Sequence, residues 1–253
     1  MDIELLFKIT VLCIVGVFMG GINTLAGGGS LITLPLLIFM GLDGPTANGT
    51  NRLSIVTQSF FAIQGYSSRG VSTYPYNLWL ALAALAGAIP GAILAVKIDA
   101  EIFNRVLAII MLVVITTLIY NPFKKNEHLQ ELVSPKRLWL SLFIVFCIGL
   151  YIGFIQAGAG IMVIMVVVLV HRFSIIKANH IKIWVTLLAN AMAMTIFVFK
   201  GMIHWEFALA LSAGSALGGW LSSRFAIEKG DKIVRPILII MTIIMALKLL
   251  NIF

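Results

Sequence analysis

Residues 26–29 read Ala-Gly-Gly-Gly and residues 157–160 read Ala-Gly-Ala-Gly, and these two stretches decide the fold. Each separates a long apolar block from a short one, at about 30–41 and 160–170. At 1.5 Å per residue the short blocks make helices of about 17–18 Å, whereas the hydrocarbon core of a bilayer is about 30 Å thick. The sequence therefore predicts two helices that glycines break at membrane depth.

The composition places these breaks in a membrane protein. Of the 253 residues, 60% are hydrophobic and 11% are charged, and the mean hydropathy is +1.06. Soluble domains carry about 25% charged residues, and uncharged apolar stretches of about 18 residues or more indicate bilayer spans. The net charge of +8 is distributed between the apolar blocks, which argues against a nucleic-acid partner. We therefore expect a multi-pass membrane protein surrounded by a lipid bilayer.

The two glycine stretches belong to an internal repeat, because an offset of 131 residues also carries the Ala-Asn pair at 47–48 onto 178–179. We predict a first transmembrane repeat at 1–120, a cytoplasmic linker at 121–136 and a second transmembrane repeat at 137–253. In each repeat, a broken or re-entrant helix hairpin precedes three transmembrane helices. The hairpin returns to the side of the membrane on which it starts, and the three spans that follow it are an odd number. The second repeat therefore starts on the opposite side and is inverted relative to the first. The predicted fold class is an all-α integral membrane protein with two inverted-topology repeats.

Basic residues predict the orientation, because they favour the cytoplasmic side of short loops. Under this layout, one side of the membrane receives twelve of the 18 Lys and Arg residues. We expect that side to face the cytoplasm. Both termini are then predicted to be periplasmic or extracellular.

Broken helices in inverted repeats are typical of secondary transporters, in which the two repeats enclose a central site. The glycine stretches precede short helices that we expect to start at Ser30 and Ile161. Free amide groups and the positive end of the helix dipole at such N-termini favour an anion. Close packing between helices is an alternative role for the same glycines. The matched pair of turns favours a binding site between them.

A polar stripe follows each short helix. Asn179, Lys182, Thr186 and Asn190 are spaced by 3, 4 and 4 residues, which places them on one helix face. Arg52 lies in the corresponding stretch of the first repeat. Carboxylates are scarce around either cation in the sequence, and an unpaired cation within a membrane is costly, so we expect a bound anion as partner. Snorkelling of these side chains to the membrane interface is the alternative.

The candidate substrate-binding residues lie in the glycine turns, beside them or on the polar stripes. They are Asn23, Thr24, Gly27, Gly28, Gly29, Ser30, Asn48, Thr50, Asn51, Arg52, Gln156, Gly158, Gly160, Asn179, His180, Lys182 and Asn190. A position in a loop explains His180 equally well. The sequence contains no HExxH, GxSxG or Walker motif. We therefore predict no catalytic residues, no metal site and no cofactor, and we do not expect an enzyme.

Several of these residues form a pattern that resembles a known family. The stretch 20–35, followed by Ala-Asn-Gly-Thr at 47–50, resembles the signature of the TauE/SafE sulfite exporter family. Residues 157–179 resemble the second repeat of that family. The resemblance implies that the turn at 27–29 and the segment at 47–50 help to build a substrate site. Ala159 stands where the first repeat has glycine, which predicts a differently shaped second hairpin.

The resemblance implies a carrier in the cell inner (plasma) membrane of a prokaryote. Such a carrier exports a small sulfur-containing anion, namely sulfite, sulfoacetate or a related organosulfonate, and inverted repeats favour alternating access as its mechanism. A passive anion channel and a carrier for another small organic anion are the alternatives, and a third is a structural subunit without transport of its own. The sequence leaves a homo-oligomer open.

Overall fold

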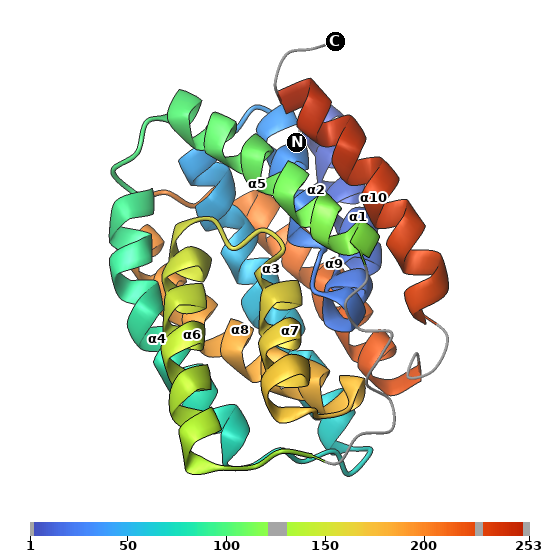
Figure 1. Cartoon of the computed structure of the whole chain (residues 1–253). Helices are drawn as coiled ribbons and strands as arrows, with labels where there is room; N and C mark the ends of the chain where they lie inside the picture. Colours follow the sequence, from blue (N-terminus) through green and yellow to red (C-terminus); the bar gives the residue numbers. More distant parts are fainter. Residues whose placement is uncertain (1–2, 121–130, 226–229, 250–253) are drawn as a thin grey trace.

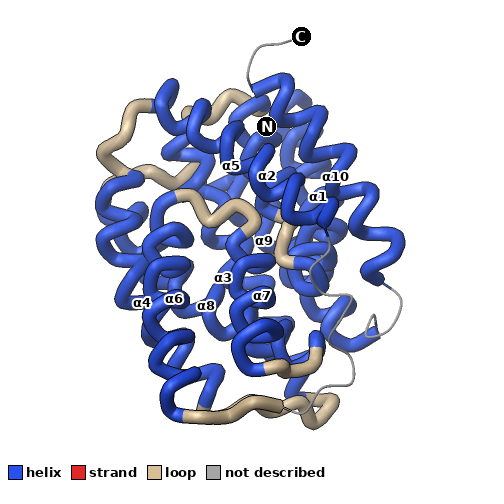
Figure 2. The backbone as a smooth tube through the Cα atoms, in the orientation of Figure 1, coloured by secondary structure: helices blue, strands red, loops and turns tan. Residues whose placement is uncertain are grey.

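The computed structural model describes residues 3–120, 131–225 and 230–249. Within these ranges every regular element is an α-helix, which confirms the all-α class (Figures 1 and 2). The helices are α1 (Ile3–Ala26), α2 (Ser30–Phe39), α3 (Gly44–Ser67), α4 (Tyr76–Ala95), α5 (Ala100–Tyr120), α6 (Pro135–Phe154), α7 (Ala159–His171), α8 (Ile175–Phe199), α9 (Trp205–Phe225) and α10 (Gly230–Leu249).

Four of the described helices, α1, α4, α6 and α8, are long and apolar enough to cross a membrane. This agrees with a multi-pass membrane protein. Helices α2 and α7 have only 10 and 13 residues. At 1.5 Å per residue they are about 15 Å and 20 Å long, so neither crosses a bilayer core by itself.

Both predicted breaks are present. Helix α1 ends before Gly27, which has φ 75°, and the second break contains Gly158 with φ 74°. Glycine adopts these left-handed angles without the steric cost that a Cβ imposes. Helix α2 begins at Ser30 as predicted, whereas α7 begins at Ala159, two residues before the predicted start.

The two breaks are also in contact with each other. A Cβ atom on Gly27 would lie 2.7 Å from the carbonyl carbon of Gly160, and a Cβ on Gly160 would lie 2.7 Å from Cα of Gly27. Real Cβ atoms do not approach backbone this closely, so only glycine fits at these two positions. The glycines therefore serve close packing as well as the turn itself.

The polar stretches after the short helices belong to α3 and α8, which agrees with the helix face predicted for the stripe at 179–190. Helix α3 begins at Gly44, where the Asp43 side chain accepts a hydrogen bond from the Thr46 amide at 3.0 Å. Helix α8 begins at Ile175, where the Ser174 hydroxyl accepts from the Lys177 amide at 3.4 Å. Asp and Ser are favoured at this capping position because they satisfy amides that the first turn leaves free. Helices α3 and α8 therefore contain the whole of these polar stretches.

Glycine-lined crossings join α1 to α9 and α4 to α6. Gly87 of α4 lies against the backbone of Phe146, and Gly214 of α9 lies against the backbone of Cys13. Small residues let helix backbones approach in this way. Helices α3 and α8 contact each other, and α3 also packs on α9 and α8 on α4. The polar stripes of α3 and α8 are thereby enclosed by protein.

The end of the predicted linker lies against the α7–α8 connection. The Leu132 amide donates to the His171 carbonyl oxygen at 2.8 Å, and Lys177 forms an ion pair with Glu131 at 2.7 Å. The remainder of the linker, residues 121–130, lies outside the described residues.

Candidate functional site

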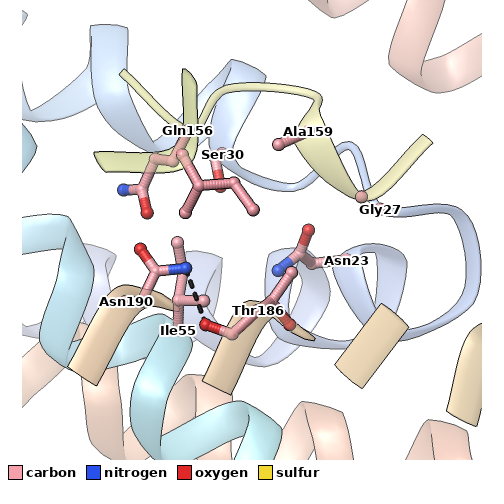
Figure 3. A pocket seen from close by; sticks show the side chains of 10 residues that line it. Asn23, Gly27, Ser30, Ile55, Gln156, Ala159, Thr186 and Asn190 are labelled. Atoms are coloured by element: carbon pink, nitrogen blue, oxygen red, sulfur yellow. Dashed lines mark hydrogen bonds between the residues drawn. The ribbon is translucent and has the colours of Figure 1, made fainter. Parts of the chain in front are cut away.

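A small cavity lies where the two glycine turns face α3 and α8 (Figure 3). The space open to the centre of a water molecule is about 10 Å³, which is room for about one water. Its lining comes from both predicted repeats: Asn23, Gly27, Ser30, Ile55, Ile152, Gln156, Ala159, Gly160, Thr186 and Asn190. Six of the seventeen candidate residues are therefore brought together here.

Two of the lining amides are held by other protein groups. Asn23 Nδ2 donates to Oε1 of Gln58 at 2.9 Å, and Gln58 Nε2 donates to the Thr24 hydroxyl at 2.9 Å. Asn190 Nδ2 donates to the Thr186 carbonyl oxygen at 2.9 Å, drawn as the dashed line in Figure 3. These bonds fix the side chains of one wall of the cavity.

Gln156 differs from these amides. Gln156 is only 4% exposed, yet neither its Nε2 nor its Oε1 has a hydrogen-bond partner within the described structure. Its φ of 62° is left-handed, which is uncommon for a residue with a side chain. Figure 3 shows this side chain on the same side of the cavity as Ser30, opposite Asn190.

The N-termini of both short helices reach the cavity. Ser30 is the first residue of α2, and Gly160 is the second residue of α7. Among the described residues, neither backbone amide has a hydrogen-bond acceptor. Amides at a helix N-terminus carry partial positive charge, so the cavity suits a negatively charged group.

Arg52 lies behind the cavity and is fully buried, with 0% exposure. Its Nη1 donates to the Ile152 carbonyl oxygen at 3.1 Å and to Asn190 Oδ1 at 3.2 Å. Its Nη2 donates to the Gly153 carbonyl oxygen at 2.5 Å, and the guanidinium lies over the Phe197 ring, 4.7 Å from the centroid. The guanidinium therefore binds the C-terminal carbonyl groups of α6.

Lys182 makes the corresponding contact in the other predicted repeat. It is 2% exposed, and its Nζ donates to the carbonyl oxygens of Asn23 at 2.8 Å and Thr24 at 2.6 Å, at the end of α1. The expectation that Arg52 and Lys182 need a bound anion as partner is therefore corrected. Helix C-termini carry partial negative charge, and their carbonyl groups supply the partners that carboxylates do not.

Two candidates of the first repeat serve the packing around the cavity. Asn48 Nδ2 donates to the Phe154 carbonyl oxygen at 2.7 Å, which adds a second contact to the end of α6. The Thr50 hydroxyl accepts from the His204 amide at 3.0 Å, so this side chain points to the start of α9.

The polar residues Asn51, Asn179 and His180 do not line the cavity. Asn51 Oδ1 accepts from the Thr33 hydroxyl at 2.8 Å, which ties α3 to α2. His180 is buried within α8 and is not a loop residue; its Nδ1 lies 2.8 Å from the Thr73 hydroxyl. Asn179 is buried, and its Oδ1 has no partner within the described structure.

Three further glycines shape the turns without lining the cavity. The carbonyl oxygens of Gly28 and Gly29 accept from amides in the first turn of α2, each at 3.1 Å. A Cβ on Gly158 would lie 2.9 Å from a methyl carbon of Val114 on α5. Gly158 adopts a left-handed φ of 74°, whereas Gly29 has a helical φ of −56° and is restricted by packing, because a Cβ there would overlap the Met19 carbonyl oxygen.

The structure adds residues that the candidate set lacks. Ile55, Ile152, Ala159 and Thr186 line the cavity, and Gln58 holds Asn23 in place. Thr186 lies on the polar stripe of the second repeat, so the stripe pattern was sufficient to find it. The two isoleucines carry no signal in the sequence, because apolar residues are the common background of this chain.

Both helix breaks expected from the sequence are present, at Gly27 and at Gly158. The family described as "Sulfite exporter TauE/SafE" matches residues 12–249. The chain belongs to the TauE/SafE family. This confirms the resemblance noted in the sequence and makes the protein a member of a membrane transporter family.

Curated relatives support this assignment. The chain is 30% identical to the probable membrane transporter protein ORF9 of Sinorhizobium sp, over 98% of this chain and 94% of the relative. It is 28% identical to a probable membrane transporter protein of Haemophilus influenzae, over 95% and 94%. It is also 28% identical to the probable membrane transporter protein YfcA of Escherichia coli K12, over 95% and 88%. No solved structure gives a significant match.

Proposed function

We propose that this TauE/SafE protein is a secondary transporter that exports a small sulfur-containing anion by alternating access. The anion would be sulfite, sulfoacetate or a related organosulfonate, and the cavity where the glycine turns face α3 and α8 would be its site. The observation that carries this proposal is the convergence of two helix N-termini, those of α2 and α7, on one small cavity that polar and apolar residues line together. We also propose the inner membrane as its location, with both termini outside.

The charges around the cavity favour an anion. Each broken helix brings a negative C-terminal end and a positive N-terminal end to the same region. Arg52 and Lys182 bind the C-terminal carbonyl groups of α6 and α1, which leaves the positive ends of α2 and α7 unopposed. No Asp or Glu is among the buried residues that the structure describes. A cation in this space would therefore lack a compensating charge.

The helix contacts support the inverted repeat. The pair α1–α9 corresponds to α6–α4 when the repeats are exchanged, and α3–α9 corresponds to α8–α4. Helix α1, which begins the first predicted repeat, starts at the upper end of the molecule in Figure 1. Helix α6, which begins the second, starts at the lower end. Arg52 and Lys182 each bind the broken helix of the other predicted repeat. Relative movement of two such repeats around a fixed site is the basis of alternating access.

The cavity in this structure is smaller than the proposed substrates. A sulfite ion or a sulfonate head is larger than the single water for which there is room. Substrate binding therefore requires the turns to separate from α3 and α8. A transporter that passes through a closed intermediate satisfies this requirement, whereas a channel needs a continuous open path.

Thermal unfolding of the purified chain in detergent tests the anion site. Sulfite and sulfoacetate should raise Tm at concentrations at which chloride has no effect, since a ligand that binds only the folded state stabilises it. Equal shifts from neutral or cationic solutes would exclude an anion site. Flux from proteoliposomes separates a carrier from a channel, because carrier flux saturates with substrate whereas a channel gives currents that do not saturate at millimolar concentrations.

A further inference from the structure

Gln156 combines two features that are unfavourable for the folded state. Its backbone is left-handed, with φ 62°, although a glycine could adopt the same angle without strain. Its side-chain amide is buried and lacks a partner at both ends. Buried polar groups in native proteins are hydrogen-bonded with few exceptions, so an unpartnered one calls for a specific explanation. Strained residues of this kind concentrate at functional sites.

The surroundings of Gln156 supply no structural role for this amide. It follows α6 and precedes α7, and it faces the cavity with Ser30 (Figure 3). The neighbouring amides Asn23 and Asn190 donate to protein oxygens, so the protein uses them to hold its own walls. The Gln156 amide remains available to a molecule that enters the cavity.

The geometry points to Gln156 as the specificity-determining residue of the transport site, where its Nε2 donates to an oxyanion held by the amides of Ser30 and Gly160. This inference rests on the proposed function, because it takes the cavity to be the substrate site. The three donors come from three different segments: α2, α7 and the turn that follows α6. Gln156 Oε1 then accepts from a protonated oxyanion or from a bound water.

Three separate donors favour an anion head with three oxygens. A sulfite or a sulfonate can offer one oxygen to each donor, whereas a planar carboxylate has two oxygens and chloride is a single atom. A buried donor that the wrong ligand leaves unpaired is the strongest basis for discrimination between similar molecules. Sulfite and methanesulfonate should therefore bind more tightly than acetate and chloride.

The test measures the rise in Tm of the full-length chain in detergent against the concentration of sulfite, methanesulfonate, acetate and chloride. The variants are Gln156→Leu, which keeps the size of the side chain, and Gln156→Gly, which also relieves the left-handed backbone. The control is Gln64→Leu, at an exposed position of α3 outside the cavity. We expect both Gln156 variants to weaken sulfite binding at least tenfold and to reduce its preference over acetate. Their Tm without ligand should equal or exceed that of the wild type.

The outcomes separate this inference from the proposed function. Wild-type protein that responds to sulfite, with Gln156 variants that respond equally, would overturn the role of Gln156 and leave the anion site intact. Loss of ligand-free stability in both Gln156→Leu and Gln156→Gly would show a structural role and also overturn it. A wild type that does not respond to any of the four anions would remove both proposals.

Discussion

Alanine at Gly27 tests whether the two glycine turns are held in contact. The added Cβ would lie 2.7 Å from the carbonyl carbon and 2.8 Å from Cα of Gly160. Both atoms belong to the backbone, so no side-chain rotation can relieve the overlap. Gly27 also has φ 75°. The substitution therefore combines a steric overlap with a left-handed backbone that alanine disfavours.

Two other glycines separate these effects. Gly201 has φ 68°, and a Cβ there would have no neighbour within 4 Å, so Gly201→Ala introduces the backbone strain alone. Gly160 does not have a positive φ, and a Cβ there would lie 2.7 Å from Cα of Gly27 and 3.0 Å from Cδ of Lys182. Gly160→Ala thus introduces the overlap alone.

The expected magnitudes follow from these two terms. Left-handed backbone costs an alanine about 1–2 kcal/mol, and overpacking by one methyl group costs about 1–3 kcal/mol. Gly27→Ala should therefore lower the free energy of unfolding by about 2–5 kcal/mol. In each of the three variants the loss of stability is smaller by about 0.4–1 kcal/mol than these steric costs, because alanine restricts the unfolded chain more than glycine does.

Equilibrium unfolding of the three variants in mixed detergent micelles measures these differences. Gly27→Ala should be the most destabilised, and its loss should approach the combined losses of Gly160→Ala and Gly201→Ala. A Gly27→Ala variant that loses no more stability than Gly201→Ala would show that the turns are not in contact. The shape of the cavity that the two turns form with α3 and α8 would then be wrong as well.

Three further predictions concern other parts of the structure. Replacing either Arg52 or Lys182 by Gln should lower the free energy of unfolding by about 1.5–3 kcal/mol, since each charged side chain satisfies two buried carbonyl groups. The double variant should also lose export in a proteoliposome assay. Unchanged export would remove both residues from the mechanism. Gly153→Ala should cost about 1–3 kcal/mol in chemical unfolding, because its Cβ would overlap the Ala88 carbonyl oxygen at the α4–α6 crossing. Glu131→Gln removes a half-exposed ion pair and should change the unfolding free energy by less than about 1 kcal/mol, so a larger loss would indicate a structural role for the linker end.

The helix breaks were predictable because glycine leaves a strong local signal and because the same signal recurs at a fixed offset. The stripe at 179–190 predicts a helix there, but neither this spacing nor the apolar pattern locates the first residues of α3 and α8. The capping residues Asp43 and Ser174 mark the true starts. They are short-range signals that precede polar residues, so the apolar pattern does not mark these positions.

The composition of the site was only partly predictable. A polar stripe shows which helix face avoids lipid, but not which partner each side chain meets. Arg52 binds carbonyl groups that lie 100 residues further along the chain, and no local pattern encodes that contact. Thr50 and His180 are on polar stretches yet point away from the cavity. Only the tertiary packing distinguishes them from Asn190, which lines it.

The crossed contacts of Arg52 and Lys182 make the two halves of the polypeptide dependent on each other during biosynthesis. Arg52 is translated long before the α6 carbonyl groups that bind it, so the first half enters the bilayer with a charge that lacks its final partner. A cell that produced either half alone would expose a membrane segment with an unsatisfied cation, the kind of defect that membrane quality control removes. Co-expression of the two halves should rescue both, since each supplies what the other lacks.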